Sequence, residues 1–255
     1  MAFKKNLWWG IFSGNNFPSF PCPRCNTGHL RAVTNTLAAK DARHSLKHDP
    51  NDLPEDYIER QFVLLAECNN DDCGAVSSVG GHFSWEESDN PKYHLELAQN
   101  IDFITPAPPM IELPEVTPRD VRAHIEKSFD LYWPDRAACA NRIRSAGESI
   151  LDSMTVPKTK RFKAKLATSR SPAKAAKVIG LDFNGRIQWL AKRNKGKAKI
   201  IDALRRIGNL GSHGGRIDQD EIHGAMILLE YLVLELYGKH EILKLAEGLG
   251  KKTKA

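Results

Sequence analysis

The chain has 255 residues, of which 41% are hydrophobic and 27% are charged. These values are ordinary for a soluble globular protein, and the length suffices for one large domain or two modest ones. No apolar run approaches the roughly 20 residues of a membrane span, and the start, MAFKKNLWWGIF, lacks the apolar region and cleavage site of a signal peptide. We therefore expect a cytoplasmic protein that does not associate with a membrane.

Charge is distributed unevenly along the chain. Residues 1–110 carry 9 Lys and Arg against 14 Asp and Glu, a net charge of −5. The remaining residues carry 28 against 17, a net charge of +11. The C-terminal half is therefore the candidate for binding a polyanion such as nucleic acid.

Four of the five cysteines form two tight pairs, Cys22-Pro-Arg-Cys25 and Cys68-Asn-Asn-Asp-Asp-Cys73. In a reducing compartment such pairs favour metal ligation over disulfides. Residues 62–67 form a short apolar run, and residues 75–83 alternate enough to be its hairpin partner. The pattern predicts a small N-terminal β-rich zinc ribbon over residues 1–88, with structural Zn²⁺ held by Cys22, Cys25, Cys68 and Cys73. Four thiolates leave no open coordination position, so the site is not expected to be catalytic.

Other features of this region have more than one interpretation. Four histidines are alternative metal ligands, but their spacing suits a zinc site less well than that of the cysteines; they are His29, His44, His48 and His82. Residues 31–57 are polar and interrupted by prolines, which predicts a surface loop. Five aromatic residues lie near the start of the chain: Trp8, Trp9, Phe12, Phe17 and Phe20. They could stack on nucleic-acid bases, or they could supply hydrophobic packing that a small metal-binding module lacks. We favour packing.

The second half has the periodicity of helices. The proline density of residues 89–115 predicts a linker. An all-α domain is expected over residues 116–247, followed by a basic tail at 248–255. Asp218 and Glu221 have the spacing of a capping box, and Cys139 is expected to be buried. The predicted helices cover residues 117–133, 135–154, 184–193, 197–207 and 222–237, with a final turn or two at 241–247.

Residues 156–177 contain eight Lys and Arg and no acidic residue. One hypothesis is a loop that follows phosphates, because counterion release rewards clustered cations. The other is a solvated connection between helices. The candidate nucleic-acid-binding residues are Lys158, Lys160, Arg161, Lys163, Lys165 and Arg170.

The sequence LRRIGNLGSHGGR, residues 204–216, is a candidate site. Gly208 is predicted to end a helix, which leaves His213 in a turn near Arg205 and Arg206. An imidazole beside guanidinium groups suits proton transfer at a phosphodiester. The alternative is that Gly208 and Asn209 only cap the helix and that His213 bonds a nearby helix end.

The sequence GNLGSHGGRID, followed by AMILLEYLVLELY, resembles an uncharacterised bacterial family, domain of unknown function 4145, of the HEPN superfamily of helical bundles. The resemblance covers roughly residues 113–237. It implies a HEPN-like bundle, whose relatives include metal-independent ribonucleases that dimerise and share an Arg-polar-x-x-x-His site. Asn209 and His213 match the polar and histidine positions, whereas Gly208 stands where the arginine would be. Arg205 and Arg206 lie further upstream.

These observations predict an α+β protein with two function classes. One is an RNA-binding or RNA-cleaving effector in bacterial defence against phage or mobile DNA, with Arg205, Arg206, Asn209 and His213 as catalytic candidates. The other is a non-catalytic scaffold in a larger nucleic-acid-processing complex. The nearly uniform hydrophobicity of residues 226–237 predicts a homodimer through this helix.

Overall fold

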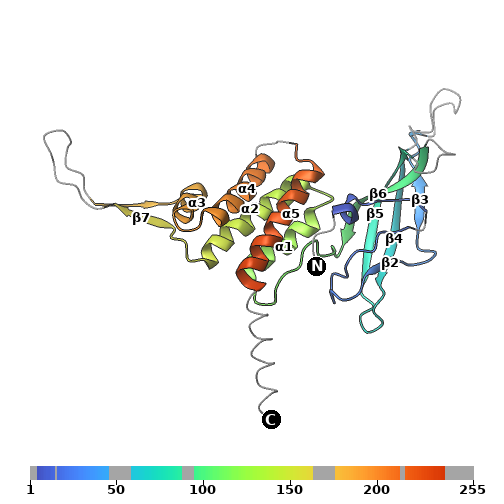
Figure 1. The fold of residues 1–255 in the computed structure, drawn as a ribbon. Helices are drawn as coiled ribbons and strands as arrows, with labels where there is room; N and C mark the ends of the chain where they lie inside the picture. Colours follow the sequence, from blue (N-terminus) through green and yellow to red (C-terminus); the bar gives the residue numbers. More distant parts are fainter. Residues whose placement is uncertain are drawn as a thin grey trace, which may run out of the picture. The chain divides into compact units, whose positions relative to one another are not determined.

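The computed structural model describes residues 5–14, 16–45, 59–87, 95–162, 176–212 and 216–238. It confirms an α+β protein, in which an antiparallel sheet is followed by helices (Figure 1). The chain divides into two compact units. The first comprises residues 1–112 and 126–139, and the second comprises residues 113–125 and 140–255. The boundaries between the units fall after residues 112, 125 and 139, and the last two lie inside helices.

The first unit contains a six-stranded antiparallel sheet in the order β1-β6-β5-β4-β2, with β3 also paired to β4. The central strand β4 alternates between exposed and buried positions, because successive side chains of a strand point to opposite faces. The predicted hairpin is present, since Leu64 pairs with Val79. The strands are β1 (Ile11–Phe12), β2 (Leu30–Ala32), β3 (Ala38–Asp41), β4 (Arg60–Cys68), β5 (Val76–Glu87) and β6 (Leu95–Thr105).

Two segments predicted to lack strands contain them. Strand β6 lies inside the proposed linker at residues 89–115, because the prolines flank the strand and its own sequence, LELAQNIDFIT, contains none. Strand β3 lies inside the proposed surface loop at residues 31–57, and β2 extends into it from Leu30; both strands pair with β4. The sheet is therefore larger than a minimal two-stranded ribbon, and it extends past residue 88.

Most of the early aromatic residues supply packing, as predicted, whereas Trp9 is 41% exposed. Trp8, Phe12 and Phe20 are buried, and the ring centroids of Trp8 and Phe20 lie 5.3 Å apart. Tyr132 belongs to the same unit and donates a hydrogen bond of 2.7 Å from its hydroxyl to the carbonyl oxygen of Trp8. These contacts bury apolar surface that a small metal module could not bury alone.

The helices lie close to their predicted positions. Cys139 is buried, and Asp218 and Glu221 form the predicted capping box. The final turn at 241–247 and the tail at 248–255 lie outside the described residues. In the part of the chain that the structure describes, no helix is long and apolar enough to cross a membrane. The helices are α1 (Arg119–Leu131), α2 (Arg136–Ser153), α3 (Phe183–Ala191), α4 (Lys195–Ser212) and α5 (Gln219–Val233), with a π-helical turn at Leu234–Gly238.

Gly208 does not end its helix, and this prediction was wrong. Helix α4 continues to Ser212, and Gly208 is buried within it. A Cβ atom at Gly208 would lie 2.9 Å from Cδ of Arg144 and 3.0 Å from the carbonyl oxygen of Ala140, both on α2. Glycine is therefore used here for close helix packing and not as a cap.

The basic segment at residues 156–177 contains strand residues at both ends. Its ends form a two-stranded antiparallel hairpin of β7 (Thr159–Phe162) and β8 (Lys177–Gly180), in which Lys160 pairs with Ile179. Both strands belong to the second unit. The exposed residues at the ends of this segment therefore have defined positions.

Candidate metal centre and nucleic-acid interface

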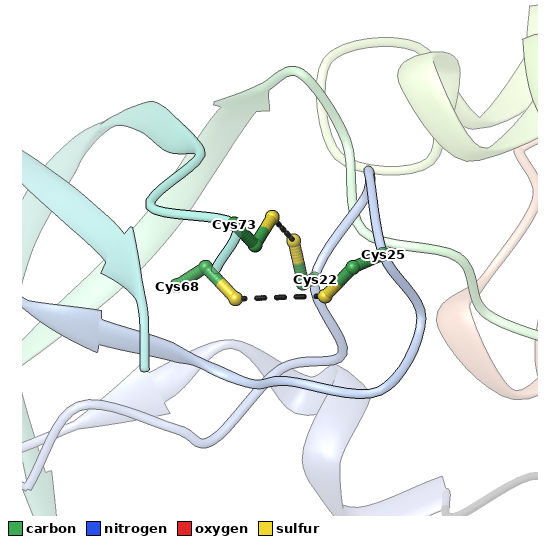
Figure 2. Close-up of side chains that lie close together, drawn as sticks. All are labelled: Cys22, Cys25, Cys68 and Cys73. Atoms are coloured by element: carbon green, nitrogen blue, oxygen red, sulfur yellow. Dashed lines mark hydrogen bonds between the residues drawn. The ribbon is translucent and has the colours of Figure 1, made fainter. Parts of the chain in front are cut away.

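The four predicted ligands lie together, with their sulfur atoms facing one another (Figure 2). The sulfur of Cys22 lies 3.8 Å from that of Cys73, and the sulfur of Cys25 lies 3.7 Å from that of Cys68. All four sulfurs lie within 4.8 Å of one another. Tetrahedral thiolates with Zn–S bonds of about 2.3 Å have sulfur atoms about 3.8 Å apart. The cluster therefore has the dimensions of a site that could hold a metal ion such as zinc.

Backbone amides point at three of the sulfurs. The N–H groups of Arg24, Gly28 and Asn70 donate to Cys22, Cys25 and Cys68 at 3.4, 3.3 and 3.4 Å. Such bonds stabilise negative charge on sulfur and orient the ligands. The two turns that carry the cysteine pairs are joined where the N–H of His29 donates to Oδ1 of Asn69 at 2.7 Å.

Gly28 has no space for a side chain. A Cβ atom there would overlap the sulfur of Cys68 and would lie 2.9 Å from Cβ of Asn70. The first turn therefore approaches the second so closely that only glycine fits between them. The cysteine spacing did not identify this residue, although a glycine three positions after the second cysteine of a pair is a usable signal.

The thiols differ in acidity. Hydrogen bonds from the Thr27 side chain and the Gly28 amide lower the pKa of Cys25 to about 5. Burial raises the pKa of Cys68 to about 12. The hydrogen bonds therefore favour the thiolate of Cys25, whereas burial favours the protonated thiol of Cys68; a bound cation would favour the thiolate at both positions.

The rival histidines do not join this cluster. Nδ1 of His82 lies 3.0 Å from a carboxylate oxygen of Asp102, and Nε2 of His44 lies 3.3 Å from one of Glu59. His48 lies outside the described residues. Among the described residues, the four cysteines form the group in which three or more His, Cys, Asp or Glu ligand atoms come together.

The catalytic candidates on α4 are only partly described, because His213 lies outside the described residues. Asp202 pairs with Arg205 at 2.8 Å and with Arg206 at 3.4 Å. Arg205 and Asn209 are four residues apart in one helix, so they lie on the same face. The guanidinium groups are therefore present, but Asp202 on their own helix already binds both of them.

Arg144 occupies the space beside Gly208. Its guanidinium lies 5.3 Å from the ring centroid of Phe183 and 3.4 Å from a carboxylate oxygen of Glu148, the partner expected at this helical spacing. Asn141, one turn earlier on α2, accepts a hydrogen bond of 2.6 Å from the hydroxyl of Ser212. Side chains of α2 therefore border α4 as far as its last residue.

Three candidate nucleic-acid-binding residues are described, and all are exposed: Lys158, Lys160 and Arg161. Lys158 pairs with Asp152 at 3.0 Å, and the ammonium group of Lys160 lies 4.7 Å from the ring centroid of Phe162. The other three candidates lie outside the described residues; they are Lys163, Lys165 and Arg170.

An ion pair that the sequence did not predict contacts the start of this segment. The side chain of Arg186 is 8% exposed, and it donates to Asp152 at 2.6 Å and to the carbonyl oxygen of Val156 at 3.2 Å. It lies on α3 between apolar positions, where an arginine needs a partner. Its partner is distant in sequence, so no local pattern could reveal it.

Residues 10–106 match a family model described as a domain of unknown function, DUF8608, and residues 126–253 match a second, described as a domain of unknown function, DUF4145. Comparison with curated proteins and with solved structures gave no match. The DUF4145 match contains the sequence GNLGSHGGRID, which had suggested that family. Because this match spans half of the 255 residues, the chain belongs to the DUF4145 family.

Proposed function

We propose that this protein is a cytoplasmic nucleic-acid-binding protein with a structural zinc ion in its N-terminal, zinc-ribbon-like unit. Cys22, Cys25, Cys68 and Cys73 hold the ion in its tetrahedral site. The sulfur distances of 3.7 and 3.8 Å support this assignment. Four thiolates complete the coordination, so the ion stabilises the fold and does not take part in chemistry.

Nucleic-acid binding is assigned to the helical unit, which we propose to be a HEPN-like bundle. The observation that carries this assignment is the segment of residues 156–177, with eight basic residues and no acidic residue. Residues 159–162 and 177 of this segment are exposed. Clustered cations of this kind bind phosphates with release of counterions. The resemblance of the helical unit to HEPN domains supports a role as an effector in bacterial defence or as a scaffold in a larger nucleic-acid-processing complex.

Fluorescence anisotropy with labelled DNA and RNA tests the binding. Affinity should fall steeply as salt rises, because each neutralised phosphate of a duplex contributes about 0.9 to the slope of log K against log salt. A protein that binds neither DNA nor RNA at 50 mM salt contradicts the proposal. Elemental analysis tests the metal: one zinc per chain is expected, and a Cys68→Ser, Cys73→Ser double variant should lose it.

RNA cleavage is a second candidate function. Arg205 and Asn209 share a face of α4, and His213 follows the end of that helix in the sequence. An imidazole could take the proton of a ribose 2′-hydroxyl while a guanidinium of Arg205 or Arg206 stabilises the charge on phosphorus. DNA lacks this hydroxyl, so cleavage should be specific for RNA and independent of metal.

The rate of RNA cleavage by the His213→Ala variant should be lower than that of the wild type by roughly two to four orders of magnitude. His124→Ala is a matched control, because it removes a histidine of the same unit from another helix. A purified protein that leaves diverse RNAs intact, or a fully active His213→Ala variant, contradicts a catalytic role.

A homodimer through α5 is also proposed. Ile227, Tyr231 and Leu234 are 48%, 57% and 38% exposed, and their spacing places them on one face. The opposite face of α5 is buried in its own unit, with Met226 and Leu229 at 0% exposure. An exposed apolar stripe of this kind is typical of an interface between subunits.

A further inference from the structure

Within the described residues, hydrogen bonds hold the β7–β8 hairpin to its own unit at its base. The N–H of Leu181 donates to the carbonyl oxygen of Lys158 at 2.7 Å. Val156, just before the hairpin, is buried and accepts from the guanidinium of Arg186. Beyond this base, all eight residues of the two strands are exposed. Figure 1 shows β7 leading away from the helices of its own unit. The hairpin is therefore a ribbon with both faces open.

Each face of this ribbon combines cations with apolar side chains. Opposite residues of an antiparallel pair share a face, so Lys160 and Ile179 lie on the same face as Phe162 and Lys177. The other face carries Arg161 and its partner Val178. Phe162, Val178 and Ile179 are large hydrophobic residues that are 45%, 56% and 40% exposed.

A two-stranded hairpin without a core is marginally stable in water, so burial of these side chains by a partner would stabilise it. The charge of the ribbon indicates the charge expected of its partner. Lys160, Arg161 and Lys177 are basic, and the eight strand residues include no acid. Pairing with the ribbon of a second copy would bring like charges together, which is unfavourable. The charge instead favours a polyanion.

The shape of the ribbon distinguishes between polyanions. The major groove of B-form DNA, about 12 Å wide and 8.5 Å deep, admits a two-stranded β-ribbon. The major groove of A-form RNA is too narrow for side chains to read. Lysine and arginine can contact phosphates and guanine, and apolar side chains can contact thymine methyl groups. We propose that the β7–β8 ribbon binds in the major groove of duplex DNA. This inference rests on the proposed nucleic-acid binding and narrows it to one substrate class.

The test compares three duplexes of one sequence: DNA, DNA with uracil in place of thymine, and RNA. The DNA duplex should bind about tenfold or more tightly than the RNA duplex, and loss of the thymine methyl groups should weaken binding. Lys160→Gln with Lys177→Gln should lower the salt slope for DNA by about 2, because two phosphate contacts are lost. Phe162→Ala should remove the preference for thymine over uracil.

A matched control is Lys192→Gln with Lys199→Gln, which removes two exposed charges from residues of the same unit that are not part of the ribbon. This variant should keep the slope and the preference. Thermal unfolding should be the same for both double variants, since the substituted residues are exposed. Equal binding of the DNA and RNA duplexes, or a ribbon variant with an unchanged slope, overturns the ribbon assignment while leaving nucleic-acid binding intact. Binding to anionic vesicles in place of DNA, or self-association that the ribbon variant abolishes, also overturns it. Absence of all nucleic-acid binding overturns the proposed function itself.

Discussion

Gly208 of α4 lies against Arg144 of α2 so closely that a Cβ atom on the glycine would overlap the Cβ of the arginine. An arginine side chain at position 208 would therefore not fit without separating the two helices. The difference from the Arg-polar-x-x-x-His arrangement thus has a structural consequence. Any guanidinium that acts with His213 must come from another position, and Arg205 and Arg206 are the candidates on the same helix.

The first prediction concerns this contact. Gly208→Ala should lower the free energy of unfolding by about 1–3 kcal/mol, because the added methyl overpacks the α2–α4 interface. Gly224→Ala is the matched control, since a Cβ there meets no atom within 4 Å. The control should leave stability unchanged or raise it by about 0.5–1 kcal/mol. Chemical denaturation measures both, and equal stability of the two variants contradicts the packing role.

The second prediction concerns Gly28 in the metal centre. Gly28→Ala should lose zinc, because the added methyl would overlap the sulfur of Cys68 and displace a ligand. Elemental analysis should find well under one zinc per chain, and chelation of the wild type should unfold the sheet-containing unit. Cys139→Ala is the control, because this buried cysteine lies outside the cluster. Full zinc content in the Gly28→Ala variant would contradict this prediction, because the two cysteine-bearing turns would then accommodate the added methyl group without loss of the metal.

The third prediction concerns Asp152 and pH. Burial raises the pKa of Asp152, but hydrogen bonds and charge from Lys158 and Arg186 outweigh this effect, so the pKa lies below its usual 3.8. A carboxylate whose pKa is depressed by folding stabilises the protein above its unfolded pKa. That stabilisation is lost as the pH falls through the folded pKa.

Asp152→Asn should therefore lower the free energy of unfolding by about 1–2 kcal/mol near neutral pH, because it leaves the buried Arg186 without its anionic partner. The difference from wild type should shrink as the pH falls from 3.8 through the lowered pKa of Asp152, because the wild-type side chain then also becomes neutral. Asp130→Asn is the control, since the exposed Lys127–Asp130 pair contributes little. Denaturation at several pH values checks this, and a difference that does not shrink as the pH falls below 3.8 would be inconsistent with it.

The fourth prediction concerns assembly. Ile227→Glu with Tyr231→Glu should convert the proposed homodimer into a monomer, because charges would replace the centre of the exposed stripe on α5. Light scattering at micromolar concentration measures this, with Gln188→Glu on exposed α3 surface as the control. Wild-type protein that is monomeric under these conditions removes the interface.

Local sequence determined the elements whose signals are short in range. The cysteine pairs predicted four ligands that the fold brings together, and alternation predicted the pairing of β4 with β5. The Asp218–Glu221 spacing predicted a capping box, because its two hydrogen bonds join residues only three apart. The family was also evident from GNLGSHGGRID and the apolar helix after it.

Only the tertiary structure decided the features that depend on contacts between distant residues. Gly208 has the local signature of a helix end, but the approach of Arg144 gives the glycine a packing role and the helix continues. The prolines near residues 95–105 argued against a strand there, but pairing of β6 with β5 provides hydrogen-bond partners for its backbone N–H and C=O groups. The bond of Arg186 to Asp152 spans 34 residues. Local propensity is weak compared with such long-range burial and hydrogen bonding, so the fold and not the local pattern fixed these positions.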